Sequence, residues 1–172
     1  MSRRVRYRID PEESRFELEA RTSLLPIHAG ATGIEGYVDV PVGPDGGVDD
    51  TGQPAGTMTF EIRHLEDANP VYRREIEHLL DSRRHPSVVV ELEHAEPRPG
   101  GGYRATGRLT VRGVSHPLDG ELDVRFPAPD RLELHGTRTV DVRDFGVEPP
   151  NLVLWRVHPD VKVRLDVVAH RA

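Results

Sequence analysis

Hydrophobic and polar residues alternate one by one along most of this sequence, and a period of two residues is typical of antiparallel strands with one apolar face. Several of these segments reach ten or eleven residues, against a usual strand length of about five or six. The predicted strands cover residues 7–10, 14–22, 30–40, 57–63, 87–96, 103–126 (a hairpin), 131–142 and 161–169.

The segment from residue 103 to 126 predicts the register of its hairpin. A glycine at residue 113 interrupts the alternation, and glycine at the first position of a two-residue loop favours a type II′ turn. A turn at residues 113–114 keeps the arginines on the outer face and the leucines on the inner face. The pairs predicted across the hairpin are Tyr103–Val124, Arg104–Asp123, Ala105–Leu122, Gly107–Gly120, Arg108–Asp119 and Leu109–Leu118.

Three segments depart from the alternation. Asn69 and Pro70 suit the cap and the first turn of a helix, and apolar residues then recur three or four positions apart until about Asp81. Residues 41–56 are rich in glycine, proline and aspartate, so they predict a surface loop. Residues 24–27 are apolar but contain a proline, and they predict a buried loop or bulge.

About eight long strands and one inserted helix predict an all-β fold. Consecutive antiparallel strands with one apolar face are typical of an up-and-down barrel, and eight strands enclose an interior that side chains fill or that holds one small ligand. A sandwich of two sheets is the alternative. A length of 172 residues suits one domain with a sizeable core, so we expect a single domain over residues 1–172.

The predicted inner face carries several small residues, and aromatic residues make up only 5% of the chain. A single inward glycine usually marks a bend of its strand, but Gly107 opposite Gly120 in mid-strand favours open space along the axis. A ligand that fills this space would be long and apolar. The residues expected to line it are Phe16, Leu18, Ile34, Val38, Met58, Phe60, Ile62, Leu79, Val90, Leu92, Ala105, Gly107, Leu109, Gly120, Leu122 and Leu134.

The charge balance argues against a nucleic-acid partner, because the formal net charge is −6 and no basic stripe outweighs the acidic residues. Cysteine is absent, which excludes disulfides, thiolate metal sites and cysteine nucleophiles. The sequence shows no signal peptide and no apolar run long enough for stable membrane insertion. We therefore expect a cytoplasmic protein, and the choice between a monomer and a homodimer stays open.

The nine histidines call for a comparison with metal sites. Glu75 and His78 have the spacing of di-iron helices, but such sites need several helices, and His78, His85 and His94 lack the close spacing of zinc ligands. We therefore expect no metal, no cofactor and no catalytic residue. The alternative is an isomerase- or cyclase-like enzyme that acts on an apolar substrate in the interior. It would need an inward ionisable group, for which Arg138 and His94 are the candidates, unless a bulge turns Arg138 outward.

Six short motifs, taken in order, resemble the YceI-like polyisoprenoid-binding family. Residues 107–114, GRLTVRGV, resemble its signature G-x-L-T-(I/V)-x-G-V/T, and the resemblance covers about residues 6–169. It implies an extended lipocalin-like antiparallel barrel whose interior holds a long isoprenoid or fatty chain. We therefore expect a non-catalytic protein that binds, carries or sequesters an isoprenoid or a fatty acid derivative. The other matching pieces are Tyr7 to Asp10 with Ser14 and Phe16, Gly30 to Gly36, Leu79 to Asp81 with His85 and Pro86, Arg143 to Val147, and Asp160 to Val163.

Overall fold

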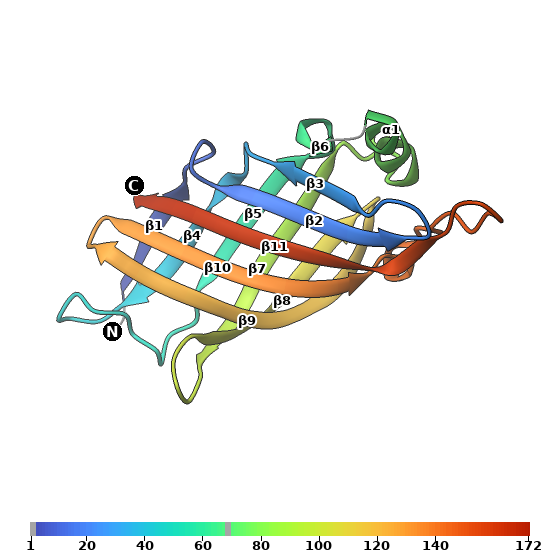
Figure 1. The fold of residues 1–172 in the computed structure, drawn as a ribbon. Coiled ribbons are helices and arrows are strands. Elements are labelled where there is room, and N and C mark those ends of the chain that lie inside the picture. Colours follow the sequence, from blue (N-terminus) through green and yellow to red (C-terminus); the bar gives the residue numbers. More distant parts are fainter. Residues whose placement is uncertain (1–2, 68–69) are drawn as a thin grey trace.

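The alternating segments form antiparallel strands that close into a barrel in the computed structural model, which describes residues 3–67 and 70–172 (Figure 1). Within these residues, a short helix, α1 (Pro70–Leu79), lies outside the wall, and two 3₁₀ turns, η1 (Ile62–His64) and η2 (Val142–Phe145), follow strands. The strands are β1 (Arg3–Ile9), β2 (Arg15–Thr22), β3 (Ile27–Ala31), β4 (Glu35–Val42), β5 (Ala55–Glu61), β6 (Glu66–Asp67), β7 (Ser87–Pro97), β8 (Tyr103–Val111), β9 (Val114–Ala128), β10 (Arg131–Asp141) and β11 (Val157–Arg171).

The wall of the barrel consists of eight long antiparallel strands, some of them interrupted. β1 and β2 pair with successive parts of β11, so they lie end to end as one strand. β4 pairs with β1 and β3 pairs with β2, which makes β3 and β4 the next interrupted strand. The order then runs from β4 through β5, β7, β8, β9 and β10 to β11. This closed barrel confirms the predicted fold class and excludes the two-sheet sandwich.

Ser14 is buried in the turn between β1 and β2, and its side chain binds this turn to β11. The Oγ atom of Ser14 donates to the carbonyl oxygen of Val168 at 3.2 Å and accepts from its N–H at 3.0 Å. The N–H of Asp10 donates to the same carbonyl oxygen at 2.8 Å. Because the turn between these residues leaves the sheet, the three hydrogen bonds satisfy backbone groups of β11 that would otherwise lose their partners.

The hairpin of β8 and β9 confirms the predicted alternation but corrects its register by two residues. Val111 faces Val114, so the two-residue loop is Arg112-Gly113. Both loop residues have positive φ angles, 53° and 73°, which define the type I′ turn. A shift by two residues leaves every side chain on its predicted face. The observed pairs are Tyr103–Leu122, Arg104–Glu121, Ala105–Gly120, Thr106–Asp119, Gly107–Leu118, Arg108–Pro117 and Leu109–His116.

A tertiary hydrogen bond accompanies this unexpected turn. Arginine seldom occupies the left-handed region that the first position of a type I′ turn requires. Here the Nη1 atom of Arg112 donates to the carbonyl oxygen of Gly146 at 2.8 Å, which ties the hairpin turn to the end of η2. The local sequence pattern contains no sign of this contact. The pattern therefore favoured the type II′ turn at residues 113–114.

α1 begins at Pro70, as predicted, and ends at Leu79, slightly before the predicted end. The predicted cap, Asn69, lies outside the described residues. Tyr72 and Ile76 form the buried side of the helix. α1 has ten residues. Among residues 3–67 and 70–172, no helix is long and apolar enough to cross a membrane.

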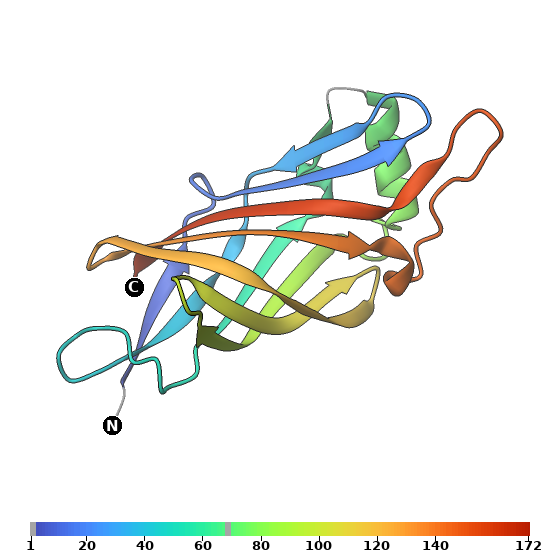
Figure 2. The same ribbon diagram turned by 60° about the horizontal axis from the view of Figure 1, so that its bottom comes forward.

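The turn between β2 and β3 corrects the prediction of a buried loop at residues 24–27. Leu24 and Leu25 are 63% and 68% exposed, and burial resumes only at Ile27, the first residue of β3. The hydroxyl of Tyr72 donates to the carbonyl oxygen of Leu25 at 2.9 Å, so the turn is held against α1 through its backbone (Figure 2). The apolar side chains of the turn are therefore left at the surface.

A closely packed part of the interior lies where β1 meets the final residues of β11 (Figure 1). Side chains of β1, β10 and β11 meet there and exclude solvent almost completely. The hydroxyl of Tyr7, which is the only polar group of this side chain, donates to the carbonyl oxygen of Pro129 at 3.0 Å. We call this region the filled end, and its residues are Val5, Tyr7, Ile9, Leu132, Val167 and Ala169.

Candidate ligand cavity

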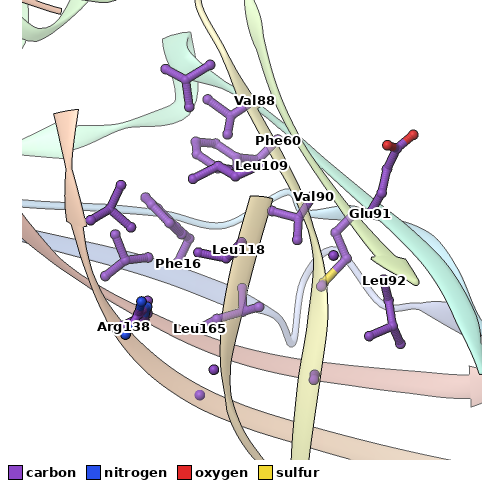
Figure 3. Close-up of a pocket in the computed structure, with 18 of the residues that line it drawn as sticks. Phe16, Phe60, Val88, Val90, Glu91, Leu92, Leu109, Leu118, Arg138 and Leu165 are labelled. Atoms are coloured by element: carbon purple, nitrogen blue, oxygen red, sulfur yellow. The ribbon is translucent and has the colours of Figure 1, made fainter. Parts of the chain in front are cut away.

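Beyond the filled end, the barrel encloses an apolar cavity of about 230 Å³ (Figure 3). Its wall is formed by inward residues of β2, β4, β5, β7, β8, β9, β10 and β11 and by residues of η2. An engineered apolar cavity of about 150 Å³ stays dry and binds benzene. The present cavity is larger and similarly apolar, so it is suited to hydrocarbon and not to water.

The structure places nearly all of the predicted lining residues around this cavity, with the exceptions of Ile62 and Leu79. Ile62 is buried in η1, and Leu79 falls beside the row formed by Tyr72, Ile76 and Leu80, which are one helical turn apart. It is Leu80 that reaches the cavity. Contact of these residues with a ligand stays a prediction. The predicted residues that line the cavity are Phe16, Leu18, Ile34, Val38, Met58, Phe60, Val90, Leu92, Ala105, Gly107, Leu109, Gly120, Leu122 and Leu134.

Sequence reasoning missed part of the cavity wall, and most of the missed residues come from the far ends of β10 and β11 and from η2 with the residue that follows it. The alternation of β11 already indicated its inward residues, and extending the prediction to them would have found that part of the wall. η2 gave no periodic signal, although Phe145 within it is buried and lines the cavity. The missed apolar residues are Leu65, Leu80, Val88, Val111, Leu118, Val140, Val142, Phe145, Val147, Val161, Val163 and Leu165.

η2 closes the cavity and is held by a local ion pair. The carboxylate of Asp141 accepts from Arg143, with Nη2 to Oδ2 at 2.7 Å, and also from the backbone N–H of Arg143 at 3.0 Å. The side-chain hydrogen bond from Arg143, followed by the backbone one, lowers the pKa of Asp141 to about 2. The turn ends at Gly146, which adopts a left-handed conformation with φ of 71°.

A second, smaller cavity of about 70 Å³ continues toward the filled end and shares Val38, Leu92, Leu122 and Leu134 with the first. These four side chains separate the two spaces. Tyr103 covers the smaller cavity, and its hydroxyl donates to Asp50 Oδ1 at 2.8 Å. Burial, then the hydrogen bond to the carboxylate, raises the pKa of Tyr103 to about 12, so the hydroxyl remains a donor that fixes the loop between β4 and β5.

The two glycines that suggested open space have different environments. Gly107 lies beside a bulge of β7, between Leu92 and His94, and a Cβ atom there would be 1.9 Å from the carbonyl oxygen of Glu91. Gly107 is therefore required for close approach of two backbones. A Cβ atom at Gly120 would find its nearest neighbour, Cδ of Arg138, at 4.0 Å. Both glycines therefore line the cavity, but only Gly120 leaves room for a side chain.

The candidate ionisable groups of the enzyme alternative separate in the structure. Arg138 lines the cavity, and no bulge occurs there, because β10 pairs with β11 in unbroken register from Arg131 to Asp141. His94 lies away from the interior, with Nδ1 3.2 Å from Oε1 of Gln53. Figure 3 shows the carboxylate of Glu91 directed away from the cavity. Among the described residues, the cavity therefore brings together no acid and base at its centre.

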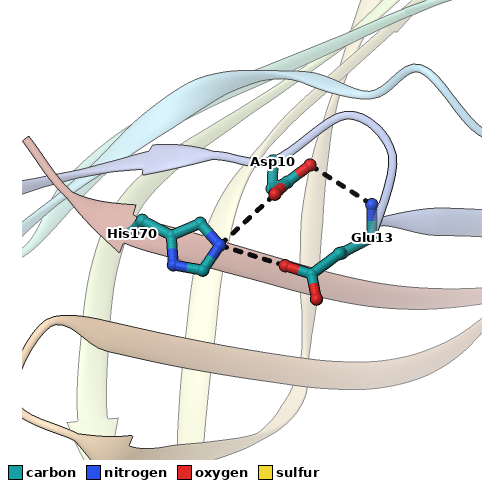
Figure 4. A group of neighbouring side chains, drawn as sticks. All are labelled: Asp10, Glu13 and His170. Atoms are coloured by element: carbon teal, nitrogen blue, oxygen red, sulfur yellow. Dashed lines mark hydrogen bonds and ion pairs between the residues drawn. The ribbon is translucent and has the colours of Figure 1, made fainter.

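The described residues contain one group with metal-ligand side chains close together, and it lies outside the barrel (Figure 4). Nε2 of His170 is 3.3 Å from Oδ2 of Asp10 and 3.0 Å from Oε2 of Glu13. Glu13 also pairs with Arg131 at 3.3 Å. These contacts form an ion-pair network that fastens the β1–β2 turn to β11. His78, His85 and His94, which the sequence analysis set aside as zinc ligands, do not belong to this group.

Comparisons with known proteins agree with this geometry. The family model described as the YceI-like domain matches residues 7–169. No curated protein matches the chain. The barrel resembles the crystal structure of BcnA from Burkholderia cenocepacia, with a TM-score of 0.77 and 16% identity over 94% of this chain and 99% of that one.

Two further solved structures have the same fold. A domain from Saccharophagus degradans, described as a polyisoprenoid binding domain implicated in plant cell wall breakdown, has a TM-score of 0.74 and 12% identity over 98% of this chain and 99% of that one. The YceI protein of Campylobacter jejuni has a TM-score of 0.66 and 14% identity, with 84% of each chain covered. At these identities, the similarity establishes a shared architecture.

Proposed function

This chain belongs to the YceI-like domain family, and we propose that it binds and carries a long isoprenoid or fatty chain inside its barrel without transforming it. The observation that supports this proposal is the apolar cavity of about 230 Å³ in the barrel interior. The similar domain from Saccharophagus degradans, described as polyisoprenoid binding, adds support for the class of ligand.

The energetics of hydrocarbon burial are compatible with reversible carriage. Each buried CH₂ group contributes about 0.8 kcal/mol, so a segment of about ten carbons contributes on the order of 8 kcal/mol. Lost translational and rotational freedom costs about 4–15 kcal/mol. Even at the lowest cost of association, a ten-carbon segment alone therefore gives a net of only about 4 kcal/mol, which corresponds to a dissociation constant of about 1 mM. Such weak binding suits a carrier that must also release its ligand, and contacts outside this segment would set the final affinity.

Filling the cavity tests this proposal. Gly120→Leu places a leucine in open space on the inner face, so the variant should fold and melt like the lipid-free wild type but carry less or shorter lipid. Glu121→Leu is the matched control, since it adds the same side chain at the neighbouring, outward position. The measurement is mass spectrometry of lipid extracted from each purified protein, together with thermal melting after delipidation.

Two results would count against carriage in the barrel. Wild-type protein that neither contains long-chain lipid nor binds it after delipidation contradicts the function itself. A folded Gly120→Leu variant with unchanged lipid contradicts the assignment of the ligand to this cavity.

A further inference from the structure

The wall of the barrel parts between β9 and β10. The two strands pair from Arg131–Ala128 to Gly136–Leu122 and no further. Beyond that point β10 continues to Asp141 paired with β11, and β9 continues back to Val114 paired with β8. Figure 2 shows the two ribbons diverging toward the end that carries η2. The cavity reaches this seam, because residues of both edges line it.

Arg138 lies in the seam and connects the interior to the surface. It occupies an inward position of β10, opposite Val163 of β11, and its Cδ lies over Gly120. Its Nη2, however, donates to Oδ1 of Asp119 at 3.1 Å, and Asp119 occupies an outward position of β9. The side chain therefore passes from the inner face to the outer edge between the two strands, with 51% of its surface exposed.

The charges at the seam are unbalanced in favour of an anion. Asp119 also accepts from Nη2 of Arg104 at 3.3 Å, so one carboxylate serves two guanidinium groups. Glu121, the next acidic residue of β9, is engaged by Arg98 at 3.0 Å. Exposed ion pairs of this kind contribute little to stability, so Arg138 exchanges Asp119 for another anion at little cost.

We propose that this seam is a lateral portal at which Arg138 binds the anionic head group of a single-chain amphiphile whose tail occupies the cavity. The inference rests on the proposed function and adds the chemical class of the ligand, a long chain that ends in a carboxylate or a phosphate. The planar guanidinium matches either head group through two parallel hydrogen bonds. The position of Arg138, with its stem inside and its charge at the edge, matches the change from tail to head.

The test compares palmitate, cetyl alcohol and cetyl phosphate, which share one chain and differ in the head group. Delipidated wild-type protein should bind palmitate about tenfold more tightly than cetyl alcohol, since a hydrogen bond to a charged group typically gives at least this factor. Arg138→Gln should weaken the binding of palmitate to the level of cetyl alcohol and so abolish the preference, while Arg138→Lys should retain part of it. Arg104→Gln is the matched control, because Arg104 contacts the same carboxylate, that of Asp119, from the outer face. This variant should keep the preference for palmitate.

The outcomes separate this inference from the proposed function. Equal affinity of the wild type for palmitate and cetyl alcohol overturns the head-group site but leaves tail binding in place. A preference that survives Arg138→Gln, or that is lost equally in Arg104→Gln, overturns the role of Arg138. Failure to bind any of the three probes overturns carriage itself. Tighter binding of cetyl phosphate than of palmitate supports the inference and identifies the head group as phosphate.

Discussion

The filled end of the barrel and the wall around the cavity follow the same alternation but have different interiors. At the filled end, Ile9, Leu132 and Ala169 are 3%, 1% and 0% exposed. In the cavity wall, the inward residues Leu118 and Leu122 of β9 are only half-buried, because their inner surfaces face open space. The period of two residues thus determines which way a side chain points. Whether other side chains contact this side chain in the interior depends on the size of the residues on all the other strands.

Truncation of one aliphatic side chain from each region should give the largest contrast. Ile9→Ala leaves a void in a packed core, where such substitutions typically cost about 2–5 kcal/mol of unfolding free energy. Leu118→Ala removes a side chain that already borders a cavity, so we expect a loss of about 1 kcal/mol. Chemical denaturation of the delipidated proteins measures both values. Equal losses would mean that the two regions are packed alike.

The two inward glycines sharpen the comparison at a smaller scale. Gly107→Ala forces a Cβ atom against the carbonyl oxygen of Glu91, and overpacking of this kind typically costs about 1–3 kcal/mol. Gly120→Ala meets no such atom, and alanine is better suited than glycine to a strand interior, so we expect no loss of stability. Thermal melting of both delipidated variants compares them directly. A Gly107→Ala variant more stable than the Gly120→Ala variant would contradict the close approach of the two backbones at the bulge.

The smallest expected effect is a response to acid at the end that η2 closes. The folded pKa of Asp141 is about 2, below its ordinary value of 3.8, so its stabilising contribution is present above about pH 4 and is lost as the pH falls toward 2. Asp141→Asn keeps the backbone cap but removes the charge. Its melting temperature should therefore fall less between pH 5 and pH 2 than that of the wild type. The control is Asp130→Asn, in the β9–β10 turn, and a wild-type-like slope in Asp141→Asn would refute the assignment.

The sequence allowed most of the fold to be predicted and failed where distant contacts decide the geometry. Alternation and the resemblance to the family gave the barrel, the helix and the inward face. The register of the central hairpin was wrong because a hydrogen bond from Arg112 to Gly146, far along the chain, accompanies the other turn. The role of Gly107 depends on a bulge in β7, and the seam at Arg138 depends on where β9 and β10 separate. None of these features has a local sequence signature.

The contact between β1 and β11 has a consequence for the order of folding. Tyr7 pairs with Arg171 and Ile9 with Ala169, so the barrel closes through residues from opposite ends of the matched domain. Such non-local pairing slows folding, since the entropy of closing a long loop must be overcome before its contacts form. During synthesis, β1 leaves the ribosome long before its partner exists. The cavity is therefore completed only when the last strand is in place, and a ligand cannot be enclosed at any earlier stage.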